Sequence, residues 1–188
     1  MEQTANWATV AVTLVLGVAG FAVAHNIRRD VRLRLAERRL AAYERLWALM
    51  RPASGYDEPL SQQARLAMCK ALTDWYYANG DGMLLERESR TVFLEARDNL
   101  VRPIAALTPA ESRLRLEGHT GNEQERHRGL LAKRQLSLLR SQLRGDLAIY
   151  GRPYGPQLDA EDWAFLAHCG VNLGRRPWKR SSRRTRQA

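Results

Sequence analysis

The sequence predicts an all-α protein in which one N-terminal transmembrane helix continues into a cytosolic bundle of about five helices. An uncharged stretch at residues 7–24 predicts the transmembrane helix. Later segments repeat apolar residues at the helical period, and no segment alternates apolar and polar residues as a half-buried strand would. We therefore expect four parts: residues 1–6 outside the cytoplasm, 7–24 in the membrane, 25–174 as the cytosolic domain and 175–188 as a disordered basic tail.

The apolar stretch at residues 7–24, WATVAVTLVLGVAGFAVA, is predicted to be a retained membrane anchor. Its 18 residues make a helix of ~27 Å, which is close to the ~30 Å hydrocarbon thickness of a bilayer. The alternative is a cleaved signal peptide, because Ala22-Val23-Ala24 is an A-x-A pattern. Residues 1–6 contain no Lys or Arg, whereas arginines follow the stretch at Arg28, Arg29, Arg32 and Arg34. By the positive-inside rule these arginines set the topology in the cell (inner) membrane, with the N-terminus out and the C-terminus cytoplasmic.

A stripe of small residues along this stretch predicts a transmembrane dimer face. Thr9, Thr13 and Gly17 recur every four residues and so lie on one side of a helix. Small side chains let two helices approach closely in a membrane, which favours a homodimer. The alternative is that Thr and Gly occur here only because they are common in any spanning helix.

The helix is expected to continue beyond the membrane, because residues 27–51 contain no Gly or Pro. Apolar residues follow a coiled-coil-like spacing at Leu33, Ala36, Leu40, Tyr43, Trp47 and Met50. Further apolar residues at Leu35, Ala42, Leu46 and Leu49 widen this stripe, which is typical of a helix packed into a bundle rather than a free two-stranded coil. Pro52 ends the segment.

Capping and breaking residues delimit the later helices. Ser61 is expected to cap the second helix, which ends at Asn79-Gly80, and a third begins near Leu84 and ends by Pro103. Capping boxes are expected to open the next two helices, with Thr108 and Asn122 as their first residues, and Asp159 should cap a last short helix. The predicted core comprises Leu40, Tyr43, Trp47, Leu72, Trp75, Phe93, Leu100, Leu136, Leu139, Leu143 and Trp163.

The net charge of +10 suggests an anionic neighbour, and the cations are densest in the C-terminal tail. The residues expected to contact a membrane surface are Arg175, Arg176, Trp178, Lys179, Arg180, Arg183, Arg184 and Arg186. Each basic residue contributes ~1 kcal/mol near anionic headgroups, and the tryptophan would enter the interface. Nucleic acid is the less expected ligand for such a tail, and a solvated tail without any partner is the other alternative.

No motif in the sequence predicts catalysis, a cofactor or a metal. There is no Gly-rich phosphate loop, nucleophile elbow or carboxylate pair of defined spacing. The histidines at positions 25, 119, 127 and 168 show no recognisable metal-binding spacing. Residues 77–88 resemble a calcium loop, but Tyr77 occupies the first position, where an acidic ligand is required. Two distant cysteines form no disulfide framework, which indicates a reducing compartment.

The segment Glu37–Met50, ERRLAAYERLWALM, follows the arginine-rich stretch and resembles small single-span, Arg- and Ala-rich bacterial membrane proteins of unknown role. The resemblance covers the first quarter of the chain and implies no activity or site. We expect a membrane-anchored interaction or regulatory protein that presents its cytosolic domain to a protein partner. The alternatives are an enzyme whose arginines clamp a membrane-bound anionic substrate such as a lipid, and a membrane tether for nucleic acid.

Overall fold

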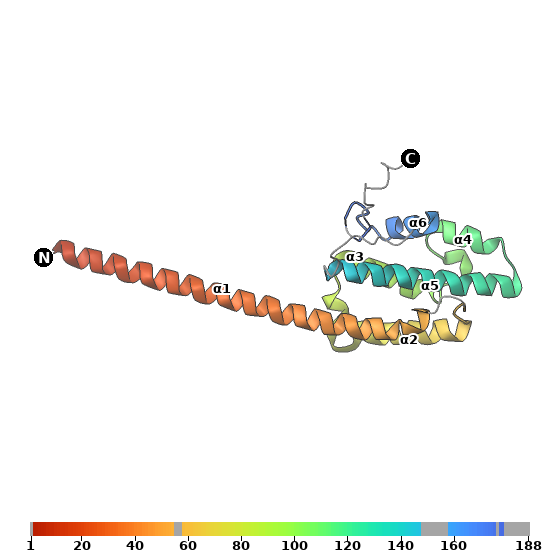
Figure 1. Cartoon of the computed structure of the whole chain (residues 1–188), viewed down its shortest axis with the longest axis horizontal. Coiled ribbons are helices and arrows are strands. Elements are labelled where there is room, and N and C mark those ends of the chain that lie inside the picture. The colour runs from red at the N-terminus through yellow and green to blue at the C-terminus, as the bar shows by residue number, and fades with distance from the viewer. Residues whose placement is uncertain (1, 55–57, 148–157, 176, 179–188) are drawn as a thin grey trace, which may run out of the picture. The chain divides into compact units, whose positions relative to one another are not determined.

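The computed structural model describes residues 2–54, 58–147, 158–175 and 177–178, except for the side chains of 2–20, 22 and 79. These residues form six α-helices and no strand, which confirms the all-α prediction (Figure 1). The chain divides into two compact units, Met1–Ala41 and Ala42–Ala188, which we describe separately.

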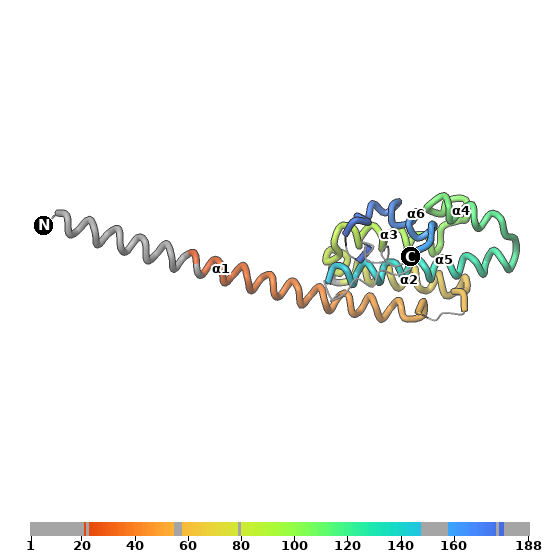
Figure 2. The backbone as a smooth tube through the Cα atoms, turned by 45° about the horizontal axis from the view of Figure 1, so that its top comes forward, coloured from red at the N-terminus to blue at the C-terminus, as the bar shows by residue number. Residues whose placement is uncertain are grey.

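The first unit is helical throughout its described backbone. Helix α1 spans Glu2–Leu49 and continues without a break through residues 25–29, as expected from the absence of Gly and Pro there (Figure 2). The large apolar side chains described in this unit are exposed, among them Leu40, which was predicted to lie in the core and is 44% exposed. The prediction for Leu40 is wrong because the buried residues of α1 begin only at Ala42.

The predicted transmembrane stretch lies within α1, but the side chains of residues 7–20 and 22 are outside the described part. Among the residues that the structure does describe, no helix combines the length and apolar character needed to cross a membrane.

The second unit is built around its longest helix, α5. The helices of this unit after α1 are α2 Gln62–Tyr77, α3 Arg87–Asn99, α4 Ala110–Glu117, α5 Gly121–Asp146 and α6 Ala160–His168. Short 3₁₀ turns lie at Arg51–Ser54, Ala78–Leu84 and Ile104–Ala106. Helix α5 contacts α2, α3, α4 and α6, and α3 is its most extensive neighbour (Figure 1). The central position of α5 explains its pattern of buried residues, which recur along nearly its whole length.

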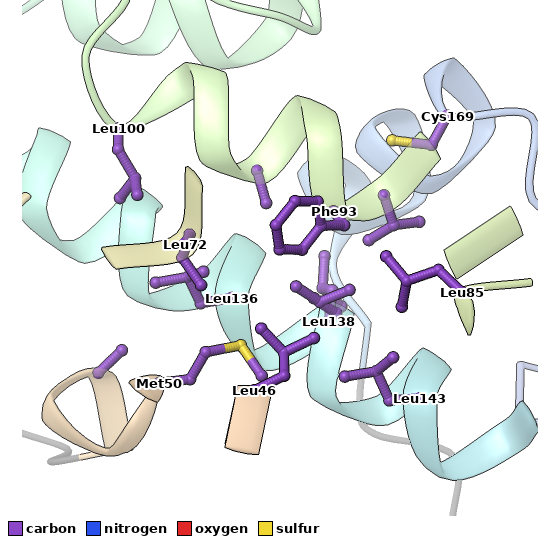
Figure 3. Packing of buried hydrophobic residues seen from close by; sticks show 14 of the residues in the cluster. Leu46, Met50, Leu72, Leu85, Phe93, Leu100, Leu136, Leu138, Leu143 and Cys169 are labelled. Atoms are coloured by element: carbon purple, nitrogen blue, oxygen red, sulfur yellow. The ribbon is translucent and has the colours of Figure 1, made fainter. Parts of the chain in front are cut away.

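A single apolar core joins α1, α2, α3, α5 and α6. Leu46 from α1, Phe93 from α3 and Leu138 from α5 lie together within it (Figure 3). The ring of Phe93 stacks on Tyr76 at a centroid distance of 5.3 Å and packs at an angle against Trp75 at 5.4 Å. The structure confirms the following predicted core residues as buried: Tyr43, Leu72, Trp75, Phe93, Leu100, Leu136, Leu139 and Leu143. Trp47 and Trp163 are only partly buried, and the guanidinium of Arg144 covers the Trp47 ring at 4.7 Å.

Two of the four predicted helix caps are confirmed. The Ser61 hydroxyl accepts a hydrogen bond from the Ala64 backbone N–H at 3.2 Å, and Asp159 forms a reciprocal capping box with Asp162. The Thr108 prediction is wrong, because α4 begins at Ala110 with Pro109 as its N-cap. The Thr108 hydroxyl instead donates to Glu95 at 2.7 Å and accepts from Arg102 at 2.8 Å.

The predicted capping box at residues 122–125 is also absent, because α5 begins at Gly121 with Thr120 as its N-cap. Glu125, the acid expected to complete that box, instead pairs with Arg65 of α2, with an N–O distance of 2.8 Å. Arg65 is almost fully buried and also donates to the Leu100 carbonyl oxygen at 3.3 Å. A buried arginine needs such partners, because an unpaired buried charge costs several kcal/mol.

Candidate functional site

The four arginines predicted to set membrane topology are exposed on α1. Arg28, Arg29, Arg32 and Arg34 all lie in the part of the helix where the described side chains face solvent. The three residues of the predicted dimer face, Thr9, Thr13 and Gly17, belong to α1 by their backbone, but their side chains are outside the described residues.

The predicted basic tail is described only as far as Trp178. Arg175 is exposed, as expected, whereas the remaining predicted contact residues Arg176, Lys179, Arg180, Arg183, Arg184 and Arg186 lie outside the described residues. Trp178 is 2% exposed, and its indole Nε1 donates to Gln142 Oε1 on α5 at 2.6 Å. The prediction that Trp178 enters a membrane interface is therefore wrong, because its ring and its polar atom are both occupied within the core.

The structure brings together three potential metal ligands, which corrects the expectation that the histidines show no metal-binding spacing. One ligand atom each from His119, Glu123 and His127 lies within 4.8 Å of the other two. The imidazole rings of His119 and His127 stack at a centroid distance of 4.0 Å and an interplanar angle of 12°. Glu123 Oε1 lies 3.5 Å from His119 Nδ1 and 4.0 Å from His127 Nε2.

A signal for this cluster is present in the sequence, where the three residues are spaced by four. The helix was expected to start at Asn122, so His119 would precede it and would not share a helical face with Glu123. In the structure α5 begins earlier, at Gly121, and His119 folds back beside its first two turns. As a result, the three residues lie close together, as residues spaced by four do on one face of a helix.

A cavity of about 730 Å³ lies next to this cluster, with His127 in its wall. Its lining also includes Arg115 and Arg134, the arrangement of arginines expected for an enzyme that binds an anionic substrate. Both arginines are already paired: Arg115 Nη1 donates to Glu161 at 2.6 Å, and Arg134 Nε donates to Asp162 at 2.7 Å. Because each positive charge has a carboxylate partner, the cavity offers little attraction to a phosphate.

A second polar cluster is buried around Asp146, near the end of α5. The hydroxyl groups of Tyr43 and Ser89 both donate to Asp146 Oδ2, and Gln142 donates to its other oxygen at 3.3 Å. Burial raises the pKa of Asp146 above its ordinary value, and these hydrogen bonds only partly offset that effect. Ser89 has no exposed surface, so it cannot act as a nucleophile toward a substrate. The cluster is best explained as a polar contact that fixes α1, α3 and α5 together.

The thiol of Cys169 is also unsuited to chemistry. Burial, together with the nearby charge of Glu95, raises the pKa of Cys169 to about 12. Because the thiolate is the nucleophile, a thiol of this pKa is nearly inert at neutral pH.

The loop that resembles a calcium site performs a structural role. Asp81 is 5% exposed, and the guanidinium of Arg45 donates to both of its carboxylate oxygens at 2.8–3.2 Å. This bidentate ion pair joins the end of α1 to the 3₁₀ turn after α2. It occupies the Asp81 carboxylate oxygens that a bound cation would need.

Comparison with known proteins adds no assignment to these sites. No protein-family model, no curated protein and no solved structure matches this chain.

Proposed function

We propose that this chain is a membrane-anchored module that presents a helical domain to a protein partner on the cytoplasmic side. The observation that carries the proposal is the uncharged stretch at residues 7–24, followed within ten residues by four arginines. A stretch of this length and composition is sufficient to span a bilayer, and arginines on one flank retain that flank in the cytoplasm. The exposure of those arginines on α1 is compatible with this role.

The architecture of the second unit supports binding rather than catalysis. Its interior is filled by one continuous apolar cluster, and its described buried acids are engaged in hydrogen bonds or ion pairs with neighbouring helices. In the cavity beside α5, the arginines that an anionic substrate would require are neutralised by Glu161 and Asp162. These observations favour a partner-binding domain over an enzyme acting on a phosphorylated lipid.

We further propose that the basic residues beyond Trp178 contact anionic lipid headgroups. Because Trp178 packs in the core, this contact would be purely electrostatic and would weaken as salt rises. Binding to anionic vesicles that is matched by binding to DNA would favour nucleic acid as the ligand instead.

The anchor is tested by membrane extraction. Two leucines in the stretch, Leu14 and Leu16, are replaced by arginine, at a cost of about 2.5–3.5 kcal/mol each near the bilayer centre. The matched control makes the same change at Leu66 and Leu114, which are 53% and 63% exposed on the domain. The parent chain and the control should stay with membranes through an alkaline carbonate wash, whereas the double variant should be released. Release of the parent chain would refute the anchor.

Partner binding is tested in intact cells by cross-linking and mass spectrometry. A reproducible partner should depend on residues 42–188 and should be lost when only residues 1–41 are expressed. Cross-links confined to a second copy of the chain would indicate a homodimer through the stripe of Thr9, Thr13 and Gly17. The absence of any reproducible cross-linked protein would contradict the proposal.

A further inference from the structure

We propose that His119, Glu123 and His127 form a binding site for a divalent transition metal, with Zn²⁺ as the best-matched ion. Their ligand atoms lie within 4.8 Å of one another. Two imidazole nitrogens and one carboxylate oxygen are the ligand set of many zinc sites that keep a fourth position open.

The local fold holds the backbone of this cluster in place. Glu123 and His127 lie four residues apart and therefore on one face of α5. Gly121 has a φ of +57°, a conformation that favours glycine, and it turns the chain between His119 and the helix. The side chain of Gln124 then donates to the carbonyl oxygens of Leu116 at 3.0 Å and His119 at 2.9 Å. These two hydrogen bonds fix the segment that carries the first histidine.

The remaining distances are within reach of small side-chain rotations. Tetrahedral zinc with bonds of ~2.0–2.2 Å separates its ligand atoms by about 3.4 Å. The distances from Glu123 Oε1 to His119 Nδ1 and His127 Nε2 are 3.5 and 4.0 Å, so the carboxylate is close to the required position. No separation in the cluster exceeds 4.8 Å, so the contraction required is at most about 1.4 Å, which rotation of the imidazoles can supply.

Exposure and charge also suit a metal. The two histidine side chains are 27% and 28% exposed and Glu123 is 66% exposed, so an ion can enter and a water molecule can complete its coordination. The ion-pair contacts of Glu123 among the described residues are with these two histidines. With both imidazoles neutral, the cluster carries one negative charge toward the cation.

A simpler role for the same residues is local packing. An acid in the first turn of a helix is favoured by the helix dipole, and two histidines can stack without any ligand. That role predicts no zinc affinity beyond that of scattered surface histidines. The metal site instead predicts one tight equivalent that depends on all three residues together.

The test titrates ZnCl₂ into the full-length chain, purified in mild detergent without a histidine tag, and follows the heat of binding. The parent protein should bind one equivalent. His119→Ala, Glu123→Gln and His127→Ala should each weaken the affinity at least tenfold, since each removes a ligand. The matched control is His168→Ala, an exposed histidine elsewhere in the domain that should leave the affinity unchanged.

Two further readouts separate ligation from damage to the fold. Co²⁺ bound in place of zinc should give the visible absorption of a four-coordinate site in the parent chain and not in the ligand variants. Zinc should also raise the thermal midpoint of the parent chain but not of His127→Ala, because only a ligand of the folded state stabilises it. Absence of stoichiometric binding by the parent chain, or equal affinities in the parent, His119→Ala and His127→Ala, would overturn the proposal.

Discussion

Replacing Trp178 by alanine should destabilise the domain strongly, although the residue lies in the arginine-rich stretch formed by the last eleven residues of the sequence. Its side chain is 2% exposed and belongs to the same apolar cluster as the buried leucines of α5. The preceding residue, Pro177, lies so close to Gly145 that a Cβ there would sit 2.5 Å from the proline ring. Pro177 and Trp178 thus pack the start of the tail against α5.

The expected loss follows from the area and the hydrogen bond. A buried tryptophan removes ~200 Å² from water, worth ~5 kcal/mol at ~25 cal/mol per Å². Measured Trp-to-Ala changes in cores cost about 3–5 kcal/mol, and leaving the Gln142 oxygen unpaired adds about 1 kcal/mol. We expect the free energy of unfolding to fall by about 4–6 kcal/mol, a large part of the ~5–15 kcal/mol that stabilises a typical domain.

Urea unfolding followed by far-ultraviolet circular dichroism measures this loss. Trp178→Phe keeps most of the apolar contact and should cost about 1–2 kcal/mol, mainly through the lost hydrogen bond. Arg175→Ala, at an exposed neighbour, should change stability by less than about 0.5 kcal/mol. A chain ending at Gly174 should be as unstable as Trp178→Ala, whereas one ending at Lys179 should match the full chain. An unchanged urea midpoint for Trp178→Ala would refute its burial and restore a membrane-interface role.

Three other residues give separate predictions. Gly129→Ala should lower the free energy of unfolding, measured in urea, by about 2 kcal/mol, because the new Cβ would lie 2.4 Å from the Leu60 carbonyl oxygen. This clash outweighs the ~1 kcal/mol by which alanine favours a helix over glycine. Gly118→Ala is the control, because the nearest neighbour of its new Cβ is 3.6 Å away. Burial raises the folded-state pKa of Asp146 above its unfolded-state value, so folding favours the protonated form of this carboxyl group. The resulting stabilisation is complete below about pH 4 and is lost as pH rises through the folded-state pKa. Asp146→Asn should flatten this part of the stability–pH curve, and an unaltered curve would contradict the assignment. Cys169, with its pKa raised to about 12, should react with iodoacetamide at pH 8 only after unfolding. The measurement uses a Cys69→Ser chain, because Cys69 is also a free cysteine and is partly exposed, and rapid labelling of that chain in its native state would show Cys169 to be accessible.

The sequence was sufficient for those features that depend on near neighbours in the chain. The periodicity of apolar residues, together with capping and breaking residues, predicted every helix, and local capping identified Ser61 and Asp159 correctly. A hydrogen bond between a side chain and a backbone group three residues away needs no information from the rest of the molecule. The same holds for the length of the uncharged stretch, on which the proposed anchor rests.

Contacts between residues far apart in the sequence determined most of the features that were predicted wrongly or not noticed. Thr108 has the residue type of a cap, but Glu95 and Arg102 from α3 and the loop after it bind its hydroxyl instead. Trp178 stands in a run of cations that suggests a solvated tail, yet Gln142 on α5 supplies a partner 36 residues away. The histidine–glutamate cluster differs, because its residues are near neighbours in the chain and only the turn at Gly121 was needed to bring His119 beside the first two turns of α5. Thr108 and Trp178 each had two competing environments, and only the tertiary contacts determined which was formed.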